Sequence, residues 1–158
     1  MVYRNLKMTT HRDIKFMPYT PDQMFKMVSN IERYPEFIPW VQSIRIRNRV
    51  CEAASEVIDA DMVVAFKVFR ERFGSRVVLK PNENRIDVSY LDGPFKYLSN
   101  QWDFEEAEGG TIVKFFVEFE FKNFILQKTM GLVFSEAMER VVSAYETRAQ
   151  QLYGKGTS

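Results

Sequence analysis

Hydrophobic residues recur at every second position in several segments of the chain, and this spacing predicts strands. The first segment alternates two sets of side chains, Arg12, Ile14 and Phe16 against His11, Asp13 and Lys15. We take Ile14 and Phe16 to mark the buried face, which places His11 on the polar, solvated face. Pro18 and Pro21 then end the strand.

A helix is predicted to follow at Pro21. Thr20 is suited to the N-cap, Pro21 to the first helical position, and Gln23 completes the spacing of a capping box. The apolar residues recur every three to four positions and form one buried stripe, Met24, Phe25, Met27, Val28 and Ile31. A second, short helical turn is expected from Ile31 to Tyr34.

Alternation resumes after Trp40 and predicts a run of antiparallel strands. Ile44 and Ile46 oppose arginines, and the next strand turns Ile58, Ala60, Met62, Val64 and Phe66 away from Asp59, Asp61 and Lys67. Turn-forming residues 81–84 join strands over 76–80 and 85–91. A strand with Trp102 and Phe104 then leads through Gly109-Gly110 to the regular alternation of Val113, Phe115, Val117, Phe119 and Phe121.

The spacing returns to a helical period from about residue 124 to residue 152. One long apolar stripe is made of Met130, Phe134, Met138, Val141, Tyr145, Ala149 and Leu152. Gly154 and Gly156 are expected to end this helix. The elements together predict an α+β domain in which a curved antiparallel sheet wraps around the last helix.

Length and composition indicate one soluble domain with a large apolar interior. The chain has 158 residues, 46% of them hydrophobic, with 14 Phe, 7 Tyr, 2 Trp and 8 Met. The formal net charge of +1 argues against electrostatic capture by nucleic acid, and we expect no DNA partner. No apolar run approaches the roughly 20 residues of a membrane span, and we see no signal-peptide core.

Residues suited to catalysis are few, and we expect a protein that is not an enzyme. His11 is the only histidine, so a histidine-based triad or histidine-rich metal site is excluded. Cys51 lies at a strand end without a neighbouring base and is interpreted as a spectator thiol. Asp59 and Asp61 share one strand face, which we interpret as a solvated acidic pair facing arginines rather than as catalytic carboxylates.

Arginines cluster on two predicted strands, at Arg45, Arg47 and Arg49 and at Arg70 and Arg72. One interpretation is that they pair across strands with Asp59, Asp61, Asp87 and similar residues. The other is a docking face for anionic lipid or for RNA phosphate. We favour pairing.

Two prolines bracket an aromatic segment at residues 34–40, YPEFIPW. Pro35 and Pro39 bias Tyr34 and Ile38 toward extended geometry, which predicts a stiff turn. The aromatic rings of this turn either cap the core or line a binding site, and the residues alone leave both open.

Large apolar side chains from the sheet and from the last helix are expected to converge on one space. The contributors are Met62, Phe66, Trp102, Phe104, Phe115, Phe119, Met130, Phe134 and Met138. This space is either filled by core packing or forms a pocket for an elongated apolar ligand, whose shape methionines can accommodate.

Several motifs carry a family resemblance over roughly residues 11–153. They are residues 18–25 (PYTPDQMF), 34–40 (YPEFIPW) and 91–98 (LDGPFKYL), followed by Trp102-Asp103-Phe104. These motifs resemble the coenzyme Q-binding protein family of the START-like, polyketide cyclase-like superfamily. Less specific matches lie at 117–122 and 149–152. On motif correspondence the positions carried over are Phe37, Pro39, Trp40, Pro94, Phe95, Leu98, Trp102 and Phe104.

The resemblance implies a helix-grip fold of about six or seven strands with an apolar tunnel, as one domain over residues 1–158. It implies ubiquinone, or a related polyprenyl lipid, as a bound ligand without a catalytic cofactor, held by a carrier or chaperone that supports respiratory electron transfer. The expected ligand-binding residues are Phe37, Pro39, Trp40, Met62, Phe66, Phe95, Leu98, Trp102, Phe104, Phe115, Met130, Phe134 and Met138. Trp40 and Trp102 are the expected indole donors near the headgroup.

The same resemblance leaves a second function open. Bacterial relatives include the ribosome association toxin, which is proposed to bind the large ribosomal subunit and to block subunit joining. The expected partners are therefore an isoprenoid lipid, a membrane surface contacted peripherally, or the ribosome. We expect a cytoplasmic protein, at the inner membrane in bacteria or on the matrix side in mitochondria. Residues 1–10 are too short to assign as a transit peptide.

Overall fold

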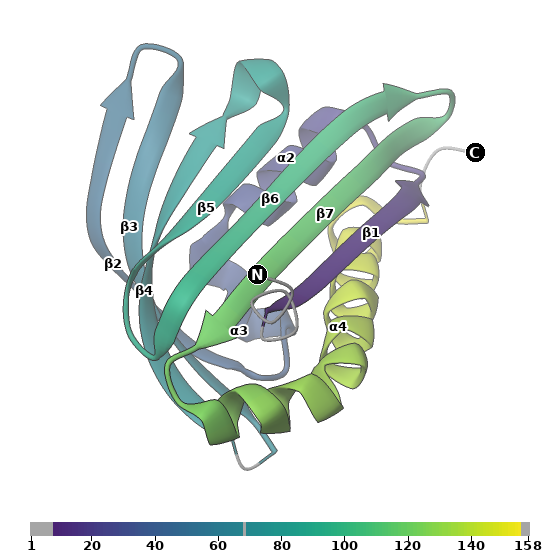
Figure 1. Cartoon of the computed structure of the whole chain (residues 1–158). Coiled ribbons are helices and arrows are strands. Elements are labelled where there is room, and N and C mark those ends of the chain that lie inside the picture. Colours follow the sequence, from purple (N-terminus) through teal and green to yellow (C-terminus); the bar gives the residue numbers. More distant parts are fainter. Residues whose placement is uncertain (1–7, 68, 156–158) are drawn as a thin grey trace.

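Seven antiparallel strands form one curved sheet in the computed structural model, which describes residues 8–67 and 69–155 (Figure 1). The strands are β1 (Thr9–Met17), β2 (Val41–Glu52), β3 (Ser55–Phe66), β4 (Phe69–Lys80), β5 (Arg85–Asp92), β6 (Phe95–Ala107) and β7 (Gly110–Phe121). Their spatial order is β1-β7-β6-β5-β4-β3-β2. Strands β2 to β7 therefore pair with their neighbours in the chain, and β1 completes the sheet beside β7.

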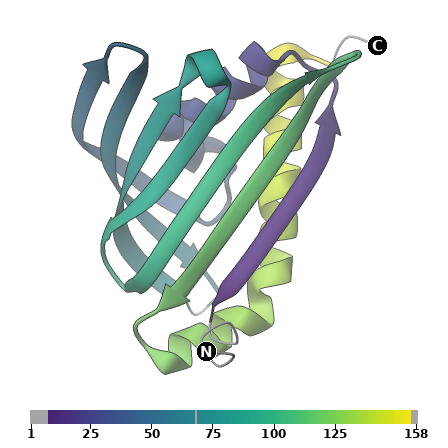
Figure 2. The same ribbon diagram turned by 45° about the horizontal axis from the view of Figure 1, so that its top comes forward.

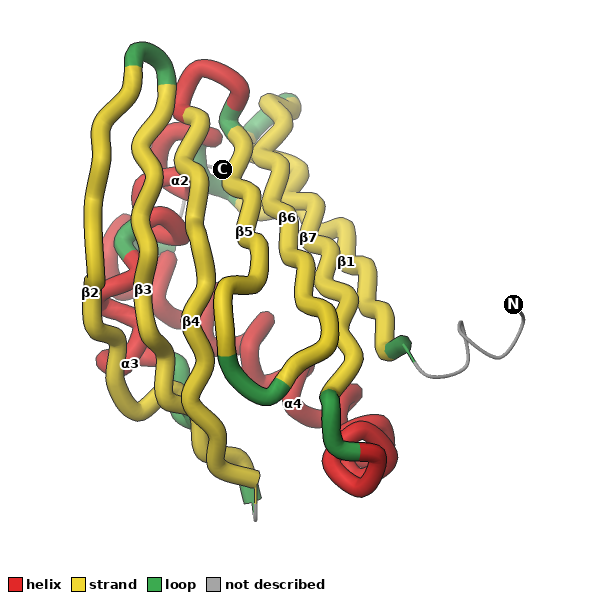
Figure 3. Tube along the Cα trace, turned by 60° about the vertical axis from the view of Figure 1, so that its left-hand side comes forward, coloured by secondary structure: helices red, strands yellow, loops and turns green. Residues whose placement is uncertain are grey.

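The helices lie together on the concave side of the sheet, behind the strands in Figure 3. They are α2 (Pro21–Ser29), the short turns η1 (Ile31–Arg33) and α3 (Tyr34–Phe37), and the long α4 (Phe124–Tyr153), while the turn η2 (Pro81–Glu83) joins β4 to β5. Figure 2 shows α4 running along the β1 side of the sheet. This is the predicted α+β architecture.

The start of α2 follows the sequence prediction closely. The Gln23 amide donates to Thr20 Oγ1 at 3.1 Å, and the Thr20 amide donates to Gln23 Oε1 at 2.9 Å, which completes the capping box. Pro21 occupies the first turn, where its missing N–H costs no helical hydrogen bond. The predicted stripe is buried and packs into the core.

The prediction for the two faces of β1 is wrong. His11, Asp13 and Lys15 share the inward face with Met17, which is 6% exposed, whereas Ile14 on the opposite face is 69% exposed. Lys15 is partly exposed and pairs with α4, where its Nζ lies 2.8 Å from Glu146 Oε2, while the His11 ring packs against Phe115 and Phe134. His11 is therefore an interior residue rather than a solvated one.

The extended geometry predicted for Tyr34 is also wrong, whereas that of Ile38 is confirmed. Tyr34 has φ −53° and ψ −40° and begins α3, while Ile38 has φ −90° and ψ 112°. Proline restricts the preceding residue only by bias, and here the buried Tyr34 side chain opposes it. Its hydroxyl donates to the Val28 carbonyl at 2.5 Å, which holds the segment helical.

The apolar stripe of α4 is confirmed except at its last member. Met130, Met138, Val141, Tyr145 and Ala149 are buried, whereas Leu152 is 47% exposed. Tyr153 packs instead at this end, because its ring meets Tyr19 and its hydroxyl donates to the Gln23 carbonyl. Gly154 ends the helix with φ 79°, and Gly156 lies outside the described residues.

Within residues 8–67 and 69–155, no helix is long and apolar enough to span a membrane.

Candidate ligand cavity

A cavity of about 240 Å³ lies between the concave face of the sheet and α4. We call it the main cavity. Strands β2 to β7, α3 and α4 contribute to its wall, which is apolar almost throughout. Ten of the predicted ligand-binding residues line it, namely Trp40, Met62, Phe66, Phe95, Leu98, Trp102, Phe115, Met130, Phe134 and Met138.

Three predicted residues lie outside the main cavity. Phe104 faces inward, but its ring packs edge-on against Phe25 of α2 at 6.0 Å, so it does not join the convergent set as expected. Phe37 packs edge-on against Tyr145 at 5.4 Å and is not part of the cavity wall. Pro39 is exposed between α3 and β2.

Four polar residues of the cavity wall were not predicted, namely Tyr34, Ser75, Asn100 and Tyr145. Strand periodicity contained the signal for two of them. Asn100 has the same parity as Trp102 on β6, and Ser75 has the same parity as Val77 on β4, so both point inward. The polar character of these side chains concealed their position.

The two tryptophans of the cavity wall differ in their hydrogen bonding. Trp102 Nε1 donates to Asn100 Oδ1 at 3.2 Å, and Asn100 Nδ2 in turn donates to the Phe116 carbonyl at 2.8 Å. Trp40 Nε1 is buried and has no partner among the described residues. Since an indole nitrogen only donates, the Trp40 N–H is an unsatisfied donor in the interior, in a residue that lines the main cavity.

Two buried tyrosines form a second polar feature of the wall. The Tyr34 hydroxyl donates to the Val28 carbonyl at 2.5 Å, and the Tyr34 and Tyr145 rings meet edge-on at 5.9 Å. Burial raises the pKa of both phenols well above the usual value, because the charged phenolate would be poorly solvated. Both hydroxyls stay protonated at physiological pH and act as hydrogen-bonding groups rather than as bases.

A smaller cavity of about 50 Å³ adjoins the first between β1, α2 and α4. It shares Trp102, Phe115 and Met138 with the main cavity wall, but it also has polar side chains, His11, Asp13, Lys15 and Glu146. The His11 ring meets Phe134 at 5.9 Å and Phe115 at 6.2 Å, and its Nε2 is buried without a partner among the described residues.

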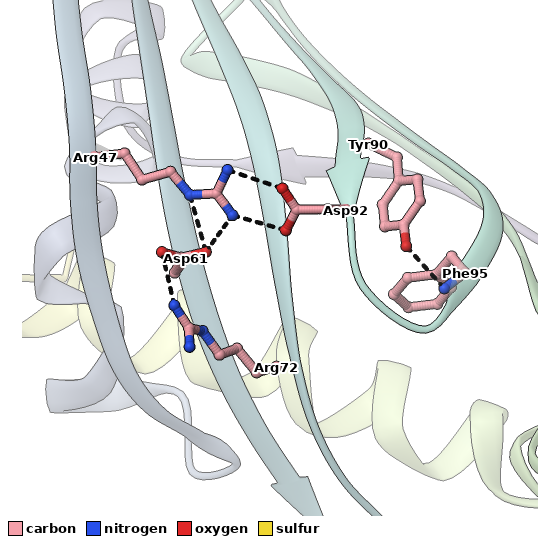
Figure 4. Close-up of polar contacts among 6 residues, drawn as sticks. All are labelled: Arg47, Asp61, Arg72, Tyr90, Asp92 and Phe95. Carbon is pink, nitrogen blue, oxygen red and sulfur yellow. Dashed lines mark hydrogen bonds and ion pairs between the residues drawn. The ribbon is translucent and has the colours of Figure 1, made fainter.

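The convex face of the sheet carries paired charges. Asp61 accepts from Arg47 at 2.6 Å and from Arg72 at 3.2 Å, and Arg47 also bridges to Asp92 at 2.7 Å (Figure 4). The Arg47 hydrogen bonds are the largest cause that lowers the pKa of Asp61. Pairing across strands is thus confirmed for Arg47 and Arg72, but Asp61, at 5% exposure, is not the solvated carboxylate expected.

The contacts of its residues explain the motif at residues 91–98. Asp92 holds Arg47, and Gly93 has φ 135°, a conformation that favours glycine. The buried Phe95 follows, and its amide donates to the Tyr90 hydroxyl at 3.1 Å (Figure 4). The turn therefore directs Phe95 into the cavity wall.

The chemistry available in the main cavity is burial of apolar surface with few directional polar contacts. No three His, Cys, Asp or Glu side chains gather as a metal site in the part of the chain that the structure describes. Cys51 is an exposed thiol near the end of β2.

The fold and cavity define a class of protein: a seven-stranded sheet gripping a long C-terminal helix around an apolar cavity is the START-like, helix-grip fold. Residues 17–146 match the family described as polyketide cyclase/dehydrase and lipid transport, so the chain belongs to that family. The START-like membership implied by the sequence motifs is therefore confirmed.

Relatives with two kinds of name match the chain. A ribosome association toxin RatA of Rickettsia prowazekii is 35% identical over 92% of this chain and 99% of its own length. A mitochondrial coenzyme Q-binding protein COQ10 homolog B of Xenopus laevis is 26% identical over 94% of this chain and 61% of its own length.

Solved structures share the fold. An 18 kDa protein of Caulobacter crescentus is 38% identical, with a TM-score of 0.79 over 92% of this chain and 99% of that one. A START superfamily protein of Mycobacterium smegmatis has a TM-score of 0.69 at 20% identity, covering 90% and 98% of the two chains. The Zhui aromatase/cyclase of Streptomyces sp. R1128 reaches 0.77 at 13% identity, covering 96% and 99%. The last two show the fold alone.

Proposed function

We propose that this chain is a ribosome-directed protein of the kind named ribosome association toxin, which binds the large ribosomal subunit and blocks subunit joining. The observation that supports this function is the match to the Rickettsia RatA at 35% identity over almost its whole length. The match to the coenzyme Q-binding homolog is weaker, at 26% identity.

The charge distribution limits how such a protein would meet the ribosome. Arg47, Arg72 and Arg76 on the convex face are paired with acids, whereas the exposed Arg45 and Arg70 have no ion pair among the described residues. Only part of this arginine cluster is therefore free for RNA phosphates, and we expect association to weaken with salt by a shallow slope.

Sedimentation with separated ribosomal subunits tests this proposal. The purified chain should travel with the large subunit in a density gradient and reduce the fraction of joined ribosomes. Arg45→Glu should weaken association more than Arg76→Glu, because Arg76 already pairs with Asp59 at 2.8 Å. Unchanged subunit joining, with no chain in the large-subunit fractions at low salt, would contradict the proposal.

A second candidate function, binding of an isoprenoid quinone such as ubiquinone, is favoured by the main cavity. Ten of the residues expected from sequence line this cavity, and burial of the ligand's apolar surface would contribute about 25 cal/mol per Å². The buried Trp40 Nε1 would donate to a quinone carbonyl, which gives the otherwise apolar wall a directional contact. In both candidate functions we propose a binding protein without a catalytic step.

The quinone proposal is tested with a matched pair of ligands and a conservative variant. Trp40→Phe removes the N–H but keeps a ring, so it should weaken binding of ubiquinone by about tenfold, the worth of one hydrogen bond. Binding of squalene, an isoprenoid without an acceptor, should not change. Mass spectrometry of lipid extracted from the native protein and quenching of tryptophan fluorescence supply the measurements. No co-purified isoprenoid and no response to any quinone would contradict the proposal.

A further inference from the structure

The first turns of α4 are apolar on two opposite sides. On one side, Met130 and Phe134 line the main cavity. On the other side, Phe124, Ile125 and Leu132 are 73%, 71% and 82% exposed. We call these three residues the α4 docking face. Exposure of three large apolar side chains on one short segment is unusual for a surface in contact with water alone.

This segment projects from the body of the molecule. Figure 1 shows the first turns of α4 running across the end of the sheet before the helix turns to follow β1. In Figure 3 the same turns extend past the ends of β6 and β7. No described residue covers the segment at Gly131, where a Cβ would meet no atom within 4 Å.

Two cations without ion pairs among the described residues lie beside the docking face, and the nearest acid of the helix, Glu136, is already paired with Lys67 and Arg140. Residues 121–135 contain two lysines, Lys122 and Lys128, and no acidic residue before Glu136. Both lysines are exposed, and neither forms an ion pair within the described residues. An apolar face flanked by cations is complementary to an anionic bilayer, where apolar groups enter the headgroup boundary and cations meet lipid phosphates.

We propose that the α4 docking face binds the surface of an anionic lipid bilayer and places the main cavity against the membrane. The proposal rests on the lipid-binding candidate function, because the same turns of α4 that carry the docking face also carry the cavity-lining Met130 and Phe134. A lipid that leaves the bilayer at this helix would pass directly to the cavity wall.

Co-sedimentation with vesicles tests the docking face. Wild-type protein should bind phosphatidylglycerol vesicles more tightly than phosphatidylcholine vesicles. The double variant Phe124→Gln and Leu132→Gln should lose about tenfold or more in vesicle affinity, since each loses an apolar side chain for insertion. Ile14→Gln is the matched control, because Ile14 is 69% exposed but lies on the outer face of β1. It should bind as the wild type does.

A second variant tests the charges, and two further measurements separate the possible outcomes. Lys122→Gln with Lys128→Gln should weaken binding to phosphatidylglycerol vesicles only. Circular dichroism checks folding, and ubiquinone titration of the Phe124 and Leu132 double variant should match that of the wild type, because neither residue lines the cavity.

Several results would overturn the proposal. Equal vesicle binding by the double variant and the wild type would exclude this face. An equal loss in Ile14→Gln would show that binding is not local to it. If gel filtration shows a wild-type dimer that the double variant breaks, a second copy covers the face instead. If the wild type binds vesicles but not ubiquinone, ubiquinone is not the ligand, and the docking face is still supported.

Discussion

Two buried ring nitrogens, Trp40 Nε1 and His11 Nε2, have no partner among residues 8–67 and 69–155, and there the interior departs from simple core packing. An unpartnered buried polar atom costs about 1–3 kcal/mol, so a folded protein keeps few of them. Trp40 lines the main cavity, whereas His11 lines the small cavity beside it. Each cavity wall thus includes one residue with an unpartnered ring nitrogen, and Trp102 and Phe115 line both cavities.

Replacement of His11 by leucine should stabilise the protein. His11→Leu keeps apolar contact with Phe115 and Phe134 and removes the unpartnered nitrogen, so the free energy of unfolding should rise by about 1 kcal/mol. His11→Gln retains a polar group and should give no gain. Urea denaturation measures both. A loss of stability in the leucine variant would mean that His11 has a partner in solution, such as a water in the small cavity.

The Arg47 guanidinium is the main stabiliser of the buried Asp61 carboxylate. The pKa of Asp61 is lowered, so its contribution is present above the unfolded aspartate pKa of about 3.9 and is lost as pH falls through the folded value. Arg47→Gln leaves only Arg72 as the cationic partner. At neutral pH the variant should have a lower free energy of unfolding than the wild type, because the buried carboxylate loses its main partner.

The pH dependence identifies the cause of this loss. The difference between Arg47→Gln and the wild type should shrink as the pH falls below the unfolded aspartate pKa of about 3.9 and through the lower pKa of folded Asp61. Arg45→Gln is the matched control, since Arg45 lies on the same strand face without an ion pair among the described residues, and it should change stability by less than about 0.5 kcal/mol. A difference that persists at low pH would assign the loss to packing instead of charge.

At the scale of elements, two glycines should respond in opposite ways to alanine. Gly93 has φ 135°, and an added Cβ would lie 2.8 Å from Phe73 Cβ, so Gly93→Ala should destabilise by about 2 kcal/mol. Gly131 lies inside α4 with open space around it, so Gly131→Ala should stabilise by up to about 1 kcal/mol. Thermal melting of both variants measures the pair. If Gly93→Ala left the protein as stable as Gly131→Ala does, the turn before β6 would be able to rearrange around the added methyl group.

Sequence periodicity predicted the elements well, because each has one apolar face and clear end signals. The capping box of α2 and the stripe of α4 correspond to observed contacts, whereas the turn expected at Gly109-Gly110 lies one residue earlier, at Glu108-Gly109, because Gly110 already pairs with Ala107. Periodicity could not identify the inward face of β1, where Lys15 pairs with Glu146, some 130 residues away in the chain. Packing against a helix so distant in the chain leaves no local signal in the periodicity of the strand.

The cavity could be predicted only in part for a related reason. Hydrophobic parity finds inward-pointing residues, but it does not separate those around a void from those packed against a helix. Phe104 and Trp102 have the same parity on β6, and α2 covers the first through Phe25 while the second faces the cavity. The difference depends on where the helices lie, which is a property of the tertiary fold.

At the scale of the whole molecule, the main cavity is small for a long lipid. Small-molecule sites usually measure about 300–1,000 Å³, whereas this cavity is about 240 Å³. A long polyprenyl chain would therefore need the cavity to widen or part of the tail to stay outside. Met62, Met130 and Met138 line the wall, and their flexible side chains allow such widening.

Met138→Lys distinguishes a ligand cavity from core packing. Met138 is 9% exposed and lines both cavities, so the ammonium of a lysine there can reach Asp13 and Glu146 in the small one. We expect a folded but less stable protein that no longer binds isoprenoid quinone, whereas Met138→Leu should keep both properties because it conserves volume. Circular dichroism melting beside ligand titration measures both. An unfolded lysine variant would identify the α4 stripe as core packing, and a folded variant with full binding would place the ligand elsewhere.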